Sequence, residues 1–255
     1  MRGAAARRGR SAPPARKVRA DVAERAREVG RRLKRAIPEP RCELRHENAW
    51  QILVATILSA QSTDRRVNLV TPALFARYGT PAALGGAPQE AVERLVKSTG
   101  FYRSKSKSIR GASRAIAEEH GGEVPRSIAA LCELPGVARK TANVVLGTAY
   151  RIATGIVVDT HVARVTDRLG LTRERDPVAI EADLTALYPK RSWVDMGHRL
   201  LLHGRYVCVA KRPLCESCAL NEICPGAQAE AVGSWTERAR TEAATVASAL
   251  AGVYP

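Results

Sequence analysis

Four cysteines within 17 residues constrain the fold of this 255-residue chain more than any other feature. They are Cys208, Cys215, Cys218 and Cys224, with the spacing C-x6-C-x2-C-x5-C, whereas Cys42 and Cys132 lie far away. Such clustering, in a chain whose N-terminus lacks the apolar core of a secretory signal, indicates a metal site rather than a disulfide framework. Four thiolates this close in sequence can surround one tetrahedral zinc ion or one iron–sulfur cubane, and their spacing does not choose between the two.

The loop between the first two cysteines of the cluster is basic. It contains Lys211 and Arg212, followed by Pro213. A bound metal would stiffen this loop, so its cations would contact a phosphate backbone with little ordering cost on binding. We therefore expect Lys211 and Arg212 to bind nucleic acid, the alternative being an ordinary solvated loop.

The chain as a whole is strongly basic, with 41 Lys and Arg residues against 25 Asp and Glu and a formal net charge of +16. Residues 1–20 carry seven of the cations and no acidic residue, and we predict a disordered basic tail there. The remainder keeps a net charge of +9, which indicates a polyanionic partner such as DNA. No segment approaches the ~18 consecutive apolar residues that a membrane span requires. We expect a monomeric, cytoplasmic, nucleoid-associated protein.

Apolar residues at three- and four-residue spacing predict an all-α protein. The clearest helical segments are 48–60, 88–98, 104–119, 139–150, 160–169 and 191–203. Asp176–Pro177 offers a helix N-cap followed by a first-turn proline. Only Ile156–Val157–Val158 resembles a strand, and it is too short to found a sheet. In a C-terminal extension, 227–255, Ser234 and Glu237 predict a capping box that opens a helix to about Leu250, for which packing is the simplest role.

Residues 131–146, LCELPGVARKTANVVL, predict a helix–hairpin–helix motif. The first helix ends at Leu134, a tight turn follows, and the second helix begins at about Arg139. The turn would aim backbone N–H groups, at the positive end of a helix dipole, toward a phosphate group. The residues that we expect to contact DNA in this way are Gly136, Val137, Ala138 and Arg139. A hairpin of this kind binds the DNA backbone and reads no base sequence.

Lys140 and Asp159 are candidates for a nucleophile and its assisting carboxylate. Lys140 falls in the first turn of the second hairpin helix, where the helix dipole, nearby Arg139 and partial burial in a cleft would lower its pKa. A neutral amine can attack carbon, whereas a solvated lysine, the alternative, stays protonated. Asp159 directly precedes the helix from Thr160, which predicts an N-cap and an ionised carboxylate. Facing Lys140 across a cleft, this carboxylate would accept protons and stabilise positive charge on a sugar.

With these features in place, the chain resembles the bacterial endonuclease III family of the helix–hairpin–helix DNA glycosylase superfamily. The resemblance extends from about Glu43 to Cys224. It is dense in ILSAQSTD (57–64), GFYRSKS (100–106), GEVP (122–125), the hairpin, VDTH (158–161) and HGRYVC (203–208). The resemblance implies two helical domains with DNA across their cleft: a six-helix barrel at 42–152 and an iron–sulfur domain from 21–41 plus 153–226. It also implies that the four clustered cysteines hold a 4Fe-4S cluster.

The activity implied by the resemblance is that of a bifunctional DNA glycosylase and AP lyase acting on oxidised pyrimidines in duplex DNA. The damaged nucleotide is flipped out of the helix. Lys140 attacks C1′ and displaces the base, the resulting Schiff base allows β-elimination on the 3′ side, and Asp159 assists. Gln61 matches a residue that fills the gap left by the flipped nucleotide. Phe101 stands where some relatives carry a leucine that wedges into the opposite strand, and Ala138 where the common hairpin pattern has a second glycine.

Two alternatives remain at this stage. The adenine-mismatch glycosylases resemble the chain in hairpin and cysteines, but they usually lack the nucleophilic lysine and carry a further C-terminal domain, whereas only about 31 residues follow Cys224 here. A non-enzymatic, metal-stabilised DNA-binding module would explain the charge, the hairpin and the cysteines. Such a module has no use for Lys140 and Asp159 together.

Overall fold

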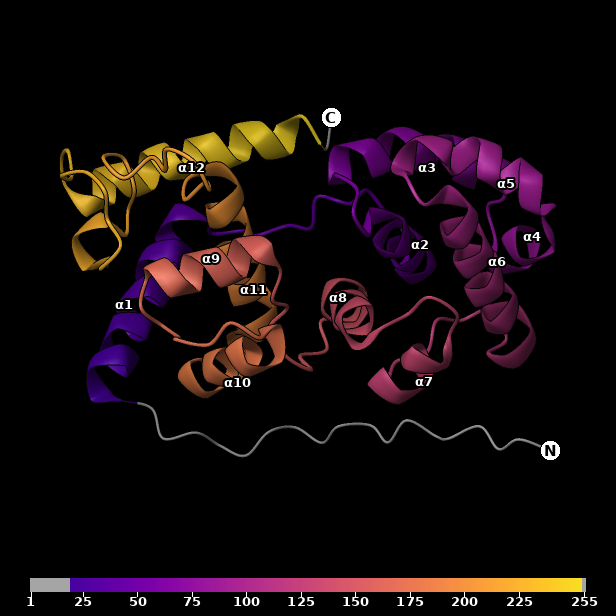
Figure 1. The fold of residues 1–255 in the computed structure, drawn as a ribbon, viewed down its shortest axis with the longest axis horizontal. Coiled ribbons are helices and arrows are strands. Elements are labelled where there is room, and N and C mark those ends of the chain that lie inside the picture. Colours follow the sequence, from indigo (N-terminus) through magenta and orange to yellow (C-terminus); the bar gives the residue numbers. More distant parts are fainter. Residues whose placement is uncertain (1–18, 254–255) are drawn as a thin grey trace.

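The protein is helical throughout the part that its computed structural model describes, residues 19–253, and this part contains no strand (Figure 1). The prediction of an all-α protein is therefore confirmed. The predicted tail lies outside the described residues except for its last two, Arg19 and Ala20, and Ala20 already begins the first helix. The strand-like segment 156–158 has no regular secondary structure and pairs with no strand. No helix within 19–253 is long and apolar enough to span a membrane.

Twelve α-helices follow one another along the described chain. They are α1 (Ala20–Ala36), α2 (Ala49–Ser59), α3 (Asp64–Arg77), α4 (Pro81–Gly86), α5 (Gln89–Val96), α6 (Tyr102–Glu119), α7 (Ile128–Glu133), α8 (Arg139–Tyr150), α9 (Thr160–Arg168), α10 (Pro177–Leu187), α11 (Trp193–Tyr206) and α12 (Trp235–Ala251). Short 3-10 turns occupy Lys97–Thr99, Lys190–Ser192 and Asn221–Ile223. All six segments singled out from the sequence contain helices, whereas α3 and α4 were not anticipated.

Polar side chains set where many of these helices begin. The side chain at the N-cap accepts a hydrogen bond from a backbone N–H of the first turn in α2, α3, α4, α7, α9, α10 and α12. Among them are the Asp176 cap of α10 and the Ser234–Glu237 capping box of α12, both of which the sequence predicted. Each such cap satisfies an N–H group that has no partner within its own helix.

Two large apolar clusters form the interior. One is built by residues between Leu44 and Leu146, with the almost wholly apolar α2 packed against α8, α6 and α3. The other joins α1 to residues between Ile156 and Leu220, chiefly from α9, α10 and α11. In Figure 1, α8 lies between the helices of the two groups. These clusters support the two domains that we propose, 42–152 and 21–41 plus 153–226.

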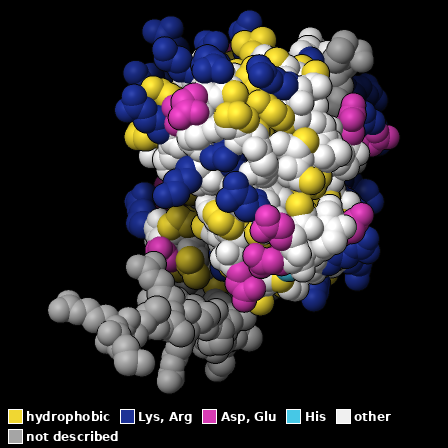
Figure 2. Space-filling model, turned by 90° about the vertical axis from the view of Figure 1, so that its right-hand side faces the viewer, with side chains coloured by type: hydrophobic (Ala, Val, Ile, Leu, Met, Phe, Trp, Pro, Cys, Tyr) yellow, Lys and Arg dark blue, Asp and Glu magenta, His cyan; other side chains and the backbone are white. Residues whose placement is uncertain are grey.

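The basic character of the sequence extends over the folded body. Figure 2 shows Lys and Arg side chains spread widely over the face that lies on the right of Figure 1, with Asp and Glu confined to a few groups. This face of the folded body therefore exposes many cations.

Candidate active site

A pocket of about 360 Å³ lies between the two apolar clusters, and it brings three of the predicted site residues together. Gln61, Lys140 and Asp159 all line it. One wall comes from residues 41–44, the end of α2 and α8, and the other from residues 155–159 and α11. Residues more than a hundred positions apart in the sequence thus face one space.

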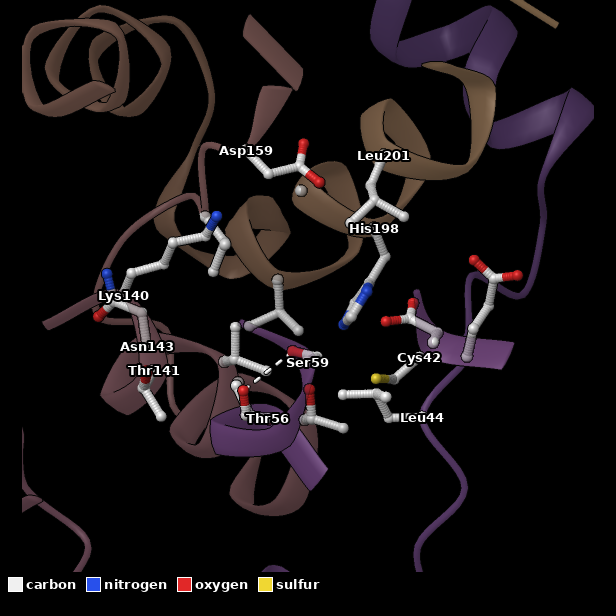
Figure 3. Close-up of a pocket in the computed structure, with 18 of the residues that line it drawn as sticks. Cys42, Leu44, Thr56, Ser59, Lys140, Thr141, Asn143, Asp159, His198 and Leu201 are labelled. Carbon is white, nitrogen blue, oxygen red and sulfur yellow. Dashed lines mark hydrogen bonds between the residues drawn. The ribbon is translucent and has the colours of Figure 1, made fainter. Parts of the chain in front are cut away.

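Lys140 lies in the first turn of α8 with its side chain exposed. In Figure 3 the side chain extends along the pocket toward Asp159. The prediction that Lys140 is partly buried is wrong for the protein without ligand, because the pocket is open to solvent at this side chain. Removal of water from this amine therefore requires a ligand that covers it.

Asp159 is placed by the short segment before α9. Ile156 and Val158 of that segment are buried, and Asp159 is half-buried at its end. Its Oδ1 accepts hydrogen bonds from the backbone N–H groups of His161 at 2.9 Å and Val162 at 2.8 Å, as expected of an N-cap. Within residues 19–253, Oδ2 makes no hydrogen bond. One oxygen caps the helix, and the other is available to a ligand in the pocket.

The hairpin turn leads directly into Lys140. Gly136 has φ +78°, and a Cβ at this position would lie 2.5 Å from Cβ of Ser108, so only glycine fits. The backbone N–H of Val137 donates to the carbonyl of Leu134 at 3.1 Å, which closes the turn. Ala138 has φ −91° and ψ 167°, an extended conformation that its methyl group tolerates. The departure from the glycine pattern therefore costs the backbone no strain.

Gln61 and Phe101 share an unusual backbone conformation. Both have positive φ, 53° and 47°, and both side chains are exposed. Gln61 follows α2 at the pocket edge, so it is not the buried helix-end amide that a purely structural role would require. Phe101 precedes α6, is 67% exposed and does not line the pocket. Left-handed non-glycine residues are strained and often occur at ligand-binding positions.

Sequence reasoning missed one wall of the pocket. It consists of residues at three- and four-residue spacing on α11: Val194, Gly197, His198, Leu201 and Arg205. This periodicity was the available signal, although it does not distinguish a pocket face from a core face. Burial, and then the nearby cation Arg151, lower the pKa of His198 to about 4, so its imidazole is neutral at physiological pH. Thr56, Ser59 and Asn143 add polar groups to the opposite wall.

Arg205 connects the two walls at the end of the pocket. Its Nη1 contacts the carboxylate of Glu43 and lies 2.7 Å from Oδ2 of Asp64. The adjacent Tyr206 donates its hydroxyl hydrogen to the same Glu43. Because Asp64 begins α3 just after Gln61, this network holds the Gln61 turn against α11.

The four clustered cysteines line a second cavity, away from the first. The N–H groups of Leu220 and Gln228 point to Sγ of Cys218 and Cys215 at 3.3 and 3.4 Å. Nη1 of Arg168 lies 3.3 Å from Sγ of Cys208. None of the six cysteines, all within the described residues, forms a disulfide. Four thiols with N–H···S contacts fit an iron–sulfur cluster, whose charge such contacts stabilise.

Lys211 and Arg212, the two cations predicted to bind DNA, are exposed on the loop between Cys208 and Cys215 and do not line the first pocket.

The sequence matches the family model described as "HhH-GPD superfamily base excision DNA repair protein" over residues 54–190. Endonuclease III of Synechocystis sp. is 52% identical over 206 residues, which cover 81% of this chain and 94% of that protein. The chain belongs to the endonuclease III family. Endonuclease III of Escherichia coli strain K12 is 42% identical over 197 residues, which cover 77% of this chain and 93% of that protein.

Solved endonuclease III structures have the same fold. A non-covalent endonuclease III–DNA complex matches with a TM-score of 0.77 and 40% identity, covering 81% of this chain and 96% of that one. A trapped endonuclease III–DNA covalent intermediate matches with a TM-score of 0.76 and 40% identity, covering 81% and 97%. The resemblance inferred from the sequence is confirmed. As a member of the endonuclease III family, the protein is a base excision repair DNA glycosylase with AP lyase activity.

Proposed function

We propose that this member of the endonuclease III family removes oxidised pyrimidines from duplex DNA through Lys140 and then cleaves the strand 3′ to the abasic site. The observation that carries the proposal is that Lys140, which directly follows a phosphate-binding type of hairpin, and Asp159, the N-cap of α9, line one pocket. A module that only binds DNA would not require this pair.

Lys140 acts as the nucleophile. A flipped nucleoside that enters the pocket covers the exposed amine and displaces its water, which favours the neutral form. Nζ then bonds to C1′ while the bond from C1′ to the base breaks and the base leaves with the electron pair. The nitrogen then loses a proton, the C1′–O4′ bond breaks and O4′ takes up a proton, which opens the sugar ring and gives a Schiff base. Removal of a C2′ proton expels the 3′ phosphate by β-elimination.

Asp159 assists through the oxygen that the helix cap does not use. Its negative charge stabilises the positive charge that develops on the sugar as the base departs. The same oxygen accepts a proton from the attacking amine, which must lose its protons to form the Schiff base. Capping by two backbone N–H groups orients the carboxylate for both tasks.

DNA binding uses surfaces around the pocket. The N–H groups of the 136–139 turn bind a phosphate, except that of Val137, which closes the turn. Lys211 and Arg212 contact the DNA backbone farther along. Gln61 fills the space of the flipped nucleotide. Phe101 stacks within the opposite strand, where base–aromatic stacking contributes about 1–3 kcal/mol. The relatives solved with DNA support a duplex partner. Such a protein would work on the nucleoid in the cytoplasm.

Cys208, Cys215, Cys218 and Cys224 would hold a 4Fe-4S cluster, as the family resemblance implies. When bound, the cluster supplies a redox-active cross-link that fixes the 208–224 loop and its cations. No step of the base removal described above passes through it. Purified protein should absorb near ~410 nm, as thiolate-ligated iron–sulfur clusters do. Elemental analysis that finds zinc and no iron would contradict the assignment.

The Lys140→Ala variant tests the proposed activity. We expect the wild-type protein to incise duplexes that contain thymine glycol or an abasic site, and to form a borohydride-stable complex with them. The variant should lose incision and trapping but still bind the duplex, because Lys140 is exposed and its removal leaves no cavity. Incision of adenine mismatches instead of oxidised pyrimidines would favour the adenine-mismatch alternative. Full trapping by the variant would remove Lys140 from the mechanism.

A further inference from the structure

Helix α12 lies outside the residues matched by the family model and packs beside the cysteine cavity. It packs against α1 and also contacts α11. Its buried side chains, Ala239 and Val246, join a small apolar cluster with residues from the end of α1, α11 and the cysteine loop. Trp235 at its start packs under the guanidinium groups of Arg31 and Arg32, 4.5 and 4.9 Å from the ring centroid. The extension is therefore integrated into the fold.

Glu242, a buried acidic residue of α12, contacts His203, which in turn lies against a cysteine of the cavity. Oε1 of Glu242 lies 2.6 Å from Nδ1 of His203 on α11, and the two side chains are 0% and 2% exposed. On the other edge of the ring, Nε2 of His203 lies 3.9 Å from Sγ of Cys218. A buried carboxylate is costly unless it is paired, so an apolar side chain would serve simple packing better. Glu242 instead holds the imidazole against a cysteine sulfur.

A second side chain of α12 reaches the same cysteine. Arg238 is 2% exposed, and its Nε donates to the backbone carbonyl of Cys218 at 2.8 Å. Its Nη2 lies 3.0 Å from Oε1 of Glu222, a residue of the cysteine loop. Arg238 and Glu242 are four residues apart and thus lie on one face of the helix. Through that face, Arg238 contacts the main-chain carbonyl of Cys218, and Glu242 contacts its sulfur by way of His203.

The group His203, Cys218 and Glu242 has donor atoms within 4.8 Å of one another, which invites comparison with a separate mononuclear metal site. The 2.6 Å between Nδ1 and Oε1 is a hydrogen-bond distance, so no cation lies between these two atoms. Cys218 also belongs to the set of four cysteines that line one cavity. Glu242 and His203 are therefore arranged as side chains that support the cluster ligand Cys218, rather than as ligands of a second metal site.

We propose that α12 completes the housing of the iron–sulfur cluster, with Glu242 acting through His203, and Arg238 through the Cys218 carbonyl, to fix Cys218 and slow the loss of iron. This inference rests on the proposed assignment of the cluster to the four cysteines. Outer partners that orient a metal ligand commonly change metal affinity 10- to 100-fold when they are removed. Glu242, His203 and Arg238 are positioning residues, remote from the base-removal pocket.

The test compares the full-length wild-type protein with Glu242→Gln, and uses Glu230→Gln as the matched control. Glu230 is an exposed acid just before α12, so the control makes the same chemical change without touching His203. Iron content and absorption near ~410 nm are measured first, followed by the rate of iron release to an added chelator. We expect Glu242→Gln to release iron about tenfold faster than the wild type, and Glu230→Gln to match the wild type. Resonance Raman spectra of the loaded proteins should show shifted Fe–S stretching bands only in Glu242→Gln.

The route through His203 is tested by adding His203→Gln and the double variant. If Glu242 acts through His203, the two effects on the iron-release rate are not additive, and the double variant resembles His203→Gln alone. Where a variant is isolated without iron, chemical reconstitution loads it before the same measurements. Equal release rates and unchanged Fe–S bands in loaded Glu242→Gln would overturn the inference while leaving the cluster in place. A wild-type protein that cannot be loaded with iron would instead overturn the cluster assignment itself.

Discussion

At the scale of single residues, Asp159 shows how one carboxylate serves both the fold and the chemistry. Its Oδ1 caps α9 through two backbone N–H groups, and it lines the pocket that contains Lys140. An asparagine in its place keeps an oxygen acceptor for the cap but carries no negative charge and accepts no proton. Asn and Asp cap helices about equally well, so the two tasks can be separated by one substitution.

We expect Asp159→Asn to retain the wild-type melting temperature within a few degrees and to remove bases at least about 100-fold more slowly. Single-turnover incision of a thymine glycol duplex measures the rate, and thermal unfolding measures stability. Asp176→Asn is the matched control, because Asp176 caps α10 through the N–H groups of Val178 and Ala179, both at 3.0 Å, away from the pocket. Equal rates in the two variants would exclude Asp159 from the chemistry.

Local backbone features could be predicted from the sequence, but the solvent exposure of individual side chains could not. The N-cap at Asp159 follows from neighbouring residues alone, and that prediction is confirmed. The burial of Lys140 was predicted wrongly, because exposure at that position depends on how far the two walls of the pocket stand apart. That separation is set by packing of elements distant in sequence.

At the scale of elements, the hairpin depends on one glycine. Gly136 combines a positive φ with close contact to Ser108 of α6, so the turn is packed against the helix beneath it. A side chain here would displace the turn and with it the N–H groups that precede Lys140. The hairpin therefore places both the phosphate contact and the nucleophile.

Gly136→Ala should weaken duplex binding and destabilise the protein, with a backbone cost of about 1–3 kcal/mol before the clash with Ser108 is counted. Fluorescence anisotropy with an abasic-site analogue duplex measures the affinity, and chemical denaturation measures the free energy of unfolding. Gly86→Ala is the control, since a Cβ at Gly86 meets no atom within 4 Å. Wild-type affinity in Gly136→Ala would show that this turn does not bind the phosphate.

Helices with a clean apolar period were predicted, whereas α3 and α4 were not, although a threonine side chain caps each of them. The segment of α3 starts with charged residues and contains Pro72, so its period is weak, yet Val67, Val70 and Leu74 are buried. The pocket face of α11 was missed for the opposite reason. Its spacing is regular, but a core face and a pocket face give the same pattern.

At the scale of the whole molecule, the pocket exists because two apolar clusters meet along α8 and α11. The Arg205 network with Glu43 and Asp64 ties these parts together at one end of the pocket. Sequence patterns predicted helices on both sides but gave no means of pairing them across the cleft. The resemblance to a known family supplied that arrangement, and the residues alone did not.

The half-buried His198 at this junction makes stability depend on pH. Burial and Arg151 lower the pKa of the folded imidazole to about 4, with Asp195 opposing and His46 adding to the shift. Below about pH 6.5 the unfolded chain binds a proton at this site that the folded chain does not. The free energy of unfolding should therefore fall as the pH drops from about 6.5 toward 4. Thermal unfolding across this range should show a shallower decline for His198→Gln, and an identical decline would contradict the assignment.

The account depends most on the identity of one amine, and mass spectrometry of the trapped complex identifies it directly. The wild-type protein is reduced with borohydride on a duplex that carries a single abasic site, digested with protease and nuclease, and sequenced by tandem mass spectrometry. We predict that the sugar-derived adduct lies on Lys140, in the peptide that follows the hairpin. An adduct on another lysine or on the N-terminal amine, with Lys140 unmodified, would contradict the central claim.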